Sequence, residues 1–126
     1  MLQNSNAFGG FSVKDINEAH HFYSEVLGLK VVKNEMGILE LHFPGDSYVI
    51  LYPKPDHQPA VFTVLSFPVE DIDATVDALL SKGITMEIYE GFNQDEKGIA
   101  WGNGPSIAWF KDPSDNILAV LSNNRM

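Results

Sequence analysis

The alternation of apolar and polar residues divides the chain into two halves with the same order of elements. A period of two indicates a strand, and apolar residues three or four apart indicate a helix. For the first half these patterns predict a strand over residues 8–13, a helix from Ile16 to Leu27 that ends at Gly28, and strands over residues 29–34, 37–43 and 47–52. Residues 53–60 contain three prolines, which predicts a linker.

The second half repeats this order, and its elements follow from the same patterns. They are a strand over residues 61–67, a helix over 72–81, and strands over 85–90, 107–110 and 116–121. The segment Val13-Lys14-Asp15-Ile16 before the first helix recurs as Val69-Glu70-Asp71-Ile72 before the second. We therefore predict one α+β domain, residues 1–126, made of two βαβββ modules at residues 7–52 and 61–122 that are joined by the linker 53–60.

Composition restricts where the protein works. Apolar residues make up 44% of the chain, but no apolar run approaches the ~18 residues of a membrane helix. There is no cysteine, which excludes disulfides and thiolate nucleophiles. The N-terminus has neither the basic start nor the apolar stretch of a signal peptide. We expect a cytoplasmic protein.

Charge restricts what the protein binds. There are 17 acidic against 8 basic residues, for a net charge of −9. Such a surface repels nucleic acid and anionic membranes, so neither is an expected partner, and it attracts cationic small molecules. The only arginine is Arg125, in the C-terminal tail. The predicted fold therefore lacks the arginine forks with which pockets usually grip carboxylates and phosphates.

Four motifs occur together with the repeated order of elements. Val-x-Asp-Ile precedes each helix, Gly28 and Gly83 follow the helices, Trp101-Gly102 lies in the long loop, and Trp109-Phe110-Lys111-Asp112-Pro113-Ser114-Asp115-Asn116 leads into the last strand. Over residues 7–122 this order resembles the vicinal oxygen chelate superfamily, the glyoxalase / bleomycin resistance protein / extradiol dioxygenase group. The resemblance implies two βαβββ modules that form a curled mixed sheet around a shared cavity, commonly in a homodimer.

The resemblance also implies where a metal would be held. Enzymes of the superfamily bind a divalent ion with side chains on the first and last strands of each module, and these positions correspond here to Phe8, Ile50, Val64 and Ala119. All four are apolar, whereas a divalent ion needs oxygen, nitrogen or sulfur ligands. We therefore expect no metal and no other cofactor, and metal-dependent lyase or dioxygenase activity is disfavoured.

No other residues predict a catalytic site. Glu40 and His42 are the only acid and histidine at strand i, i+2 spacing, and we interpret them as a polar pair on a half-solvated strand rather than as metal ligands. Ser12, Ser66 and Thr63 have no evident His/Asp relay in the sequence, so no nucleophile is predicted.

The strand period also predicts which residues line the cavity. Side chains two residues apart on a strand point to the same face, so the alternation predicts which residues face the cavity together with the four metal-ligand positions. These residues are expected to bind a small molecule. With the two tryptophans they are Phe8, Gly10, Ser12, Glu40, His42, Tyr48, Ile50, Tyr52, Phe62, Val64, Ser66, Trp101, Trp109 and Ala119. Glu40, and on a wider reading Glu87 with Tyr89, would supply negative charge near the mouth. The alternative is that the two halves close on each other and these rings form a core.

Three functions fit this pattern. The first is a metal-independent small-molecule-binding protein of the bleomycin-resistance type, a homodimer that sequesters an aromatic or cationic compound. The second is a glyoxalase- or dioxygenase-like enzyme with a non-standard or acid–base site, in which Glu40 or His42 would be the base. The third is a non-catalytic dimeric interaction protein. Loop 91–105, with Trp101, would cap a ligand or plug a partner subunit.

Overall fold

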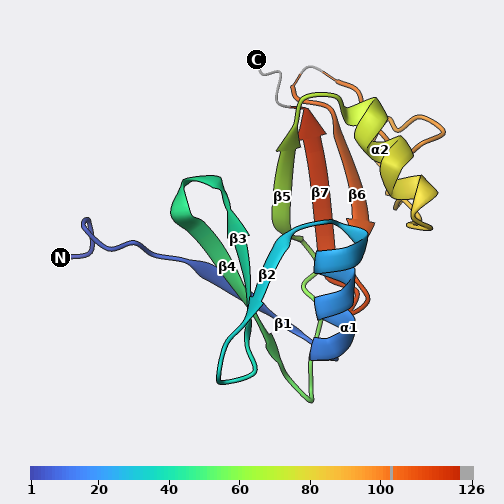
Figure 1. Cartoon of the computed structure of the whole chain (residues 1–126). Coiled ribbons are helices and arrows are strands. Elements are labelled where there is room, and N and C mark those ends of the chain that lie inside the picture. The colour runs from blue at the N-terminus through green and yellow to red at the C-terminus, as the bar shows by residue number, and fades with distance from the viewer. Residues whose placement is uncertain (103, 123–126) are drawn as a thin grey trace. The chain divides into compact units, whose positions relative to one another are not determined.

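The computed structural model describes residues 1–102 and 104–122, so Arg125 and position 103 of the predicted long loop lie outside the described residues. The chain forms two compact units, Met1–Gln58 and Pro59–Met126 (Figure 1). Each unit contains one sheet with both parallel and antiparallel pairs, together with helix. The α+β class and the mixed sheets of the prediction are confirmed, whereas the union of both modules in one domain stays a prediction.

The first unit is built on a four-stranded sheet. In chain order its elements are β1 (Gly9–Val13), α1 (Ile16–His21), a π-helical turn (Phe22–Val26), β2 (Lys30–Lys33), β3 (Leu39–Phe43), a 3-10 turn (Pro44–Asp46) and β4 (Ser47–Pro53). The strand order is β1-β4-β3-β2. β1 runs parallel to β4, and the remaining pairs are antiparallel.

The helix of this unit differs from the regular helix that was predicted. It begins as expected at Asp15, whose carboxylate accepts hydrogen bonds from the backbone N–H groups of Asn17 and Glu18 at 2.9 and 3.0 Å. Its second half widens to π geometry, as the bond from Leu27 N to Phe22 O over 2.9 Å shows. Gly28, at φ 75°, ends the segment in the left-handed conformation that glycine tolerates best.

One face of the first sheet forms the core of the unit. Burial alternates along the strands, so that one side of each strand packs with the helical segment. The buried residues are Val13, Ala19, Phe22, Tyr23, Leu39, Leu41 and Leu51. The alternate residues of the strands occupy the opposite face, which carries half of the predicted site.

The second unit is built on a three-stranded sheet. Its elements are β5 (Thr63–Val69), α2 (Ile72–Ser81), β6 (Ile107–Lys111) and β7 (Ile117–Ser122), in the strand order β5-β7-β6. Asp71 caps α2 by accepting a hydrogen bond from Ala74 N at 3.0 Å. α2 packs against β7, and the buried core of the unit includes Ile72, Val76, Leu79, Ala108, Phe110, Leu118 and Val120.

The predicted strand over residues 85–90 is wrong. Only Glu87 pairs with a neighbour, through an isolated bridge to Trp109 in which Glu87 N donates to Trp109 O over 2.8 Å. The carboxamide of Gln94 takes the place of a further strand. It accepts from Tyr89 N at 2.8 Å and donates to Glu87 O at 2.9 Å, so a side chain binds the backbone groups that a strand ladder would otherwise bind.

Candidate functional site

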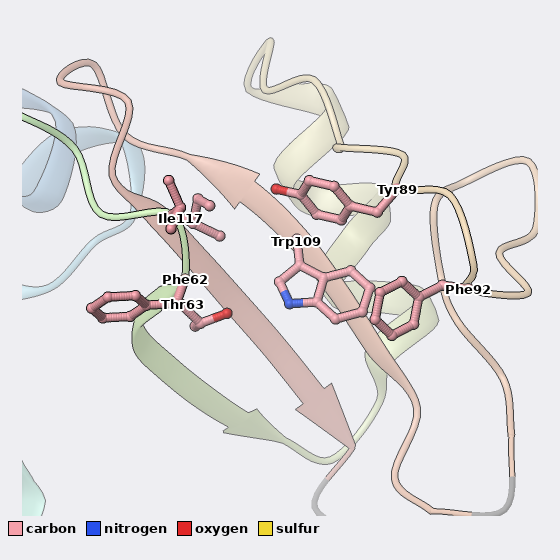
Figure 2. Close-up of a pocket in the computed structure, with 7 residues that line it drawn as sticks. Phe62, Thr63, Tyr89, Phe92, Trp109 and Ile117 are labelled. Carbon is pink, nitrogen blue, oxygen red and sulfur yellow. The ribbon is translucent and has the colours of Figure 1, made fainter.

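The second unit contains an open hollow of about 390 Å³ on the face of the sheet opposite α2 (Figure 2). Its size falls within the range of small-molecule pockets. The residues that line it are Val61, Phe62, Thr63, Tyr89, Phe92, Trp109 and Ile117. None of them is charged. Four carry aromatic rings, and the rings of Tyr89 and Phe92 both contact the indole of Trp109.

Trp109 is the centre of the aromatic wall. The register β6–β7 places it opposite Ala119, whose small side chain is 3% exposed and leaves room on the sheet for the indole. The ring of Tyr89 meets the indole edge-on, with centroids 5.5 Å apart and planes at 77°. The ring of Phe92 lies 4.9 Å from it at 54°. Both partners come from the segment after α2, so a strand and a loop build the wall together.

A β-bulge interrupts the predicted alternation of β5. The alternation predicted Phe62, Val64 and Ser66 on one face. The register instead shifts between Thr63 and Leu65, so that Ser66 pairs with Ala119 but Thr63 pairs with Ile117. The extra residue moves the open face by one position along the chain. Thr63 and Phe62 therefore line the hollow, whereas Val64 and Ser66 are not among its lining residues.

The hydroxyl of Tyr89 is the polar atom that distinguishes this hollow. Its oxygen is buried, and it has no hydrogen-bond partner within residues 1–102 and 104–122. Burial, together with the nearby negative charge of Glu87, raises the pKa of Tyr89 above its usual value, so the group keeps its proton. The other polar groups of the lining are the Thr63 hydroxyl and the indole N–H of Trp109, which points away from Phe92 (Figure 2).

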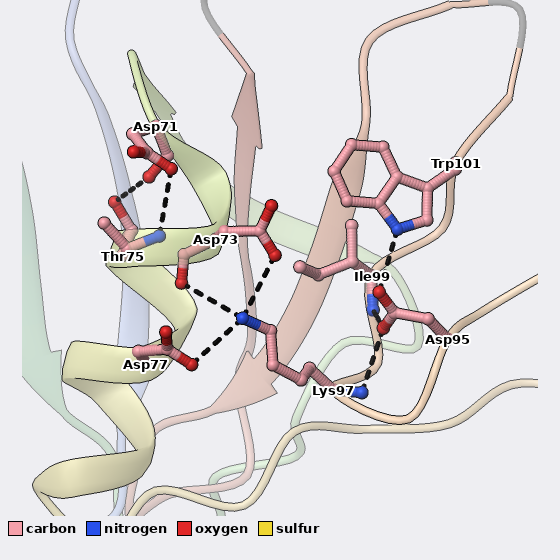
Figure 3. A network of polar contacts seen from close by, with 9 residues as sticks. Asp71, Asp73, Thr75, Asp77, Asp95, Lys97, Ile99 and Trp101 are labelled. Carbon is pink, nitrogen blue, oxygen red and sulfur yellow. Dashed lines mark hydrogen bonds and ion pairs between the residues drawn. The ribbon is translucent and has the colours of Figure 1, made fainter.

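Trp101 belongs to a second, smaller hollow of about 240 Å³, which also uses Phe92 and Trp109. Its indole N–H donates to Asp95 Oδ2 over 2.8 Å (Figure 3). Burial opposes ionisation of Asp95. The bonds from Trp101 and from the backbone N–H groups of Ile99 and Lys97 outweigh it and hold the pKa of Asp95 below its usual value.

The loop that carries Trp101 is tied to α2. Lys97 Nζ lies 3.0 Å from Asp73 Oδ1 and 3.0 Å from Asp77 Oδ1 (Figure 3). Gln94 adds a bond to Gly98 O at 2.8 Å. The first part of the loop is therefore held in place by side-chain bonds.

The open face of the first unit carries a stack of rings. The rings of Phe8 and Tyr48 are stacked with centroids 4.8 Å apart, and those of Tyr48 and His42 with centroids 5.6 Å apart. His42 Nε2 lies 2.8 Å from Glu40 Oε1. The structure thus brings together four of the predicted site residues, with both the acid and the histidine only partly exposed.

Gly10 and Ile50 are neighbours on the same face. They pair across β1 and β4, and a Cβ atom at Gly10 would lie 2.5 Å from Ile50 Cγ1. Any side chain at position 10 would therefore displace Ile50, and only glycine fits there. Tyr52, which pairs with Ser12, is 37% exposed at the end of this face.

A contact between Ser12 and His57 was missed by the sequence analysis. Ser12 Oγ and His57 Nδ1 are hydrogen-bonded over 2.6 Å, so Ser12 has a histidine partner that the sequence did not reveal. His57 lies in the proline-rich linker, far from Ser12 in sequence. Lys54 N also donates to Val13 O over 3.0 Å, so the linker follows β1 through two bonds. The linker is irregular and has no periodic pattern of apolar residues, so these contacts could not be predicted from the sequence.

The sequence matches the Glyoxalase/Bleomycin resistance protein/Dioxygenase superfamily over residues 8–120. The chain belongs to this superfamily. The resemblance seen in the sequence motifs is therefore confirmed. No curated protein matches the chain.

Solved structures of the superfamily fold are similar over nearly the whole chain. TnmS3, an antibiotic-binding protein from Streptomyces sp. CB03234, is 24% identical, with a TM-score of 0.64 over 94% of this chain and 96% of its own. A glyoxalase/bleomycin resistance protein from the same organism is 22% identical, with a TM-score of 0.60 over 91% and 99%. The fosfomycin resistance protein FosX from Listeria monocytogenes is 12% identical, with a TM-score of 0.69 over 94% and 92%.

The side chains at the four predicted metal-ligand positions do not fit a metal. Phe8 and Ile50 lie on the open face of the first unit, Val64 lies at the bulge of β5, and Ala119 is buried on β7. None of the four offers an oxygen or nitrogen side-chain ligand. Within residues 1–102 and 104–122, no three or more His, Asp or Glu side chains are grouped so that they could hold an ion.

In the same described part of the chain, no helix is long and apolar enough to cross a membrane.

Proposed function

We propose that this superfamily member is a metal-independent binding protein that sequesters a small aromatic or cationic compound without chemical turnover. The observation that carries the proposal is the hollow of the second unit, with about 390 Å³ of space beside Trp109, Tyr89 and Phe92. Aromatic walls hold flat molecules by burial of apolar area and by ring contacts of ~0.5–1.5 kcal/mol per pair.

The open face of the first unit supports the cationic part of the proposal. Phe8, Tyr48 and His42 present stacked rings, and the carboxylate of Glu40 lies beside them. Ring faces and a nearby carboxylate both attract a cation. The net charge of −9 acts in the same direction at longer range.

Two further parts of the proposal concern assembly and location. We propose a homodimer, since members of the superfamily commonly dimerise, and a cytoplasmic location, which is compatible with a chain that contains no cysteine. TnmS3, which is similar in fold, is an antibiotic-binding protein, and this supports the binding class proposed for the present chain.

A thermal-shift panel of neutral and cationic aromatic compounds tests the proposal. A ligand at 100 times its Kd stabilises the folded protein by ~2.7 kcal/mol, which raises Tm. Phe92→Ala should weaken binding about tenfold and cost little stability, because this ring is 54% exposed. Leu80→Ala, which removes an apolar side chain that is 41% exposed on α2, is the matched control and should leave binding unchanged. A flat response to every compound would refute the proposal.

The contact between His42 and Glu40 supports a second candidate, an enzyme with an acid–base site. The separation of 2.8 Å is short enough for the carboxylate to orient the imidazole. If this pair is catalytic, Glu40→Gln should reduce turnover of a bound compound while its Kd is largely kept. Incubation of the ligands found above with the protein, followed by mass spectrometry, decides between binding alone and turnover.

A further inference from the structure

The hollow beside Trp109 combines a large apolar surface with one unsatisfied polar atom. The buried hydroxyl of Tyr89 has no partner within residues 1–102 and 104–122, although buried polar groups are nearly always hydrogen-bonded. The residue lines the hollow, and its ring is fixed against the indole of Trp109. Its backbone is also held, because Tyr89 N donates to Gln94 Oε1 over 2.8 Å. A positioned donor without a partner indicates that a ligand supplies the partner.

We propose that Tyr89 selects the ligand of this hollow, and that the ligand is a flat aromatic compound carrying a neutral hydrogen-bond acceptor such as a ring carbonyl. The inference rests on the proposed binding function and names the ligand class for this hollow. The rings of Trp109 and Phe92 hold the flat body, and the Tyr89 hydroxyl donates to the acceptor.

The polar side chains of the lining favour a ligand that carries a hydrogen-bond acceptor over a ligand that carries only donors. The side chains of Tyr89, Thr63 and Trp109 can each donate a hydrogen bond, and no carboxylate lines the hollow to receive a donor from the ligand. An aromatic compound that carries only donors would therefore satisfy these groups less well. A compound without any polar atom would leave the tyrosine hydroxyl unsatisfied in the complex as well.

The surrounding charge favours a neutral acceptor over an anionic one. Glu87 lies close enough to Tyr89 for its charge to act on the hydroxyl. Lys111 Nζ lies 3.9 Å from the Glu87 carboxylate but is not part of the lining, and no lysine or arginine is among the lining residues that the structure describes. A carboxylate or phosphate in the hollow would meet this negative charge without an opposite charge in the lining. Like any tyrosine, Tyr89 is protonated at neutral pH, and burial, which raises its pKa further, favours the neutral donor form.

The experiment compares three flat tricyclic probes of nearly equal size. 9-Fluorenone carries a carbonyl, fluorene has a methylene group at the same position, and 10-methylacridinium is a cation without an acceptor. Their Kd values are measured by equilibrium dialysis with chromatographic quantification. We expect fluorenone to bind ~3- to ~10-fold more tightly than fluorene, the effect of one net hydrogen bond. Tyr89→Phe should abolish this difference, because it removes the hydroxyl and keeps the ring.

The control is Ser81→Ala, which removes a hydroxyl at the end of α2 that bonds Ala78 O over 2.7 Å. It should keep the preference for fluorenone. Equal affinity of fluorenone and fluorene, or tightest binding of 10-methylacridinium, would overturn the inference and leave the proposed binding function standing. No binding of any probe, with a flat response in the thermal-shift panel, would overturn both.

Discussion

The indole N–H of Trp101 donates a hydrogen bond to Asp95 Oδ2 over 2.8 Å. The same carboxylate accepts from Lys97 N and Ile99 N through Oδ1, each at 2.9 Å, so one side chain holds both the turn of the loop and the tryptophan. The wall of the smaller hollow therefore depends on Asp95 being ionised. This relationship makes a prediction about pH.

We predict that the Trp101 contact is lost only in strong acid. The pKa of Asp95 is lowered from its ordinary value of 3.8, so its contribution to stability is fully present above pH 3.8 and is lost as the pH falls through the lowered pKa. Trp101 fluorescence, measured in a Trp109→Phe background, should stay constant from pH 7 to about 4 and change below 3.8. Asp95→Asn should remove this transition, and a midpoint above 3.8 would contradict the assignment.

We predict that Gln94 contributes more to the free energy of unfolding than its partly exposed position suggests. Its carboxamide accepts from Tyr89 N and donates to Glu87 O and Gly98 O, at 2.8 to 2.9 Å. Gln94→Leu leaves all three backbone groups without this partner and should lower the free energy of unfolding by ~1–3 kcal/mol in urea denaturation. Gln94→Glu keeps an acceptor for Tyr89 N but turns a carboxylate oxygen toward the carbonyl oxygens of Glu87 and Gly98, so at neutral pH it should also be destabilising. An unchanged urea midpoint for both variants would argue against these three bonds.

Gly10 is predicted to tolerate no side chain. A Cβ atom there would lie 2.5 Å from Ile50 Cγ1 and 2.9 Å from Ile50 O, and the backbone oxygen cannot move aside as a side chain can. Gly10→Ala should lower the free energy of unfolding by ~1–3 kcal/mol through overpacking. Gly9→Ala is the matched control, because nothing lies within 4 Å of a Cβ atom at that position. The two variants should differ clearly in their urea midpoints.

The periodic parts of the chain were predictable because burial follows their period. Glu40 and His42 alternate with the buried residues Leu39 and Leu41 and therefore lie on the open face. The bulge at Val64 was not predictable, since neither glycine nor proline marks it in the sequence.

Three parts of the site were missed for the same physical reason. Phe92 lines the hollow from an irregular loop, and Gln94 replaces a strand by side-chain bonds. His57 reaches Ser12 from the linker. Each depends on a local backbone path without a repeat, so the pattern of apolar residues carries no information about it.

Removal of the Tyr89 hydroxyl should stabilise the free protein. In most proteins Tyr→Phe in a buried position breaks a hydrogen bond and lowers stability. Here the hydroxyl is buried and has no partner among the described residues, so its desolvation is uncompensated. Tyr89→Phe should therefore raise the free energy of unfolding by ~1 kcal/mol in urea denaturation, and raise Tm by a few degrees. A loss of stability would show that the hydroxyl has a partner in solution, and it would remove the reason to assign that partner to a ligand.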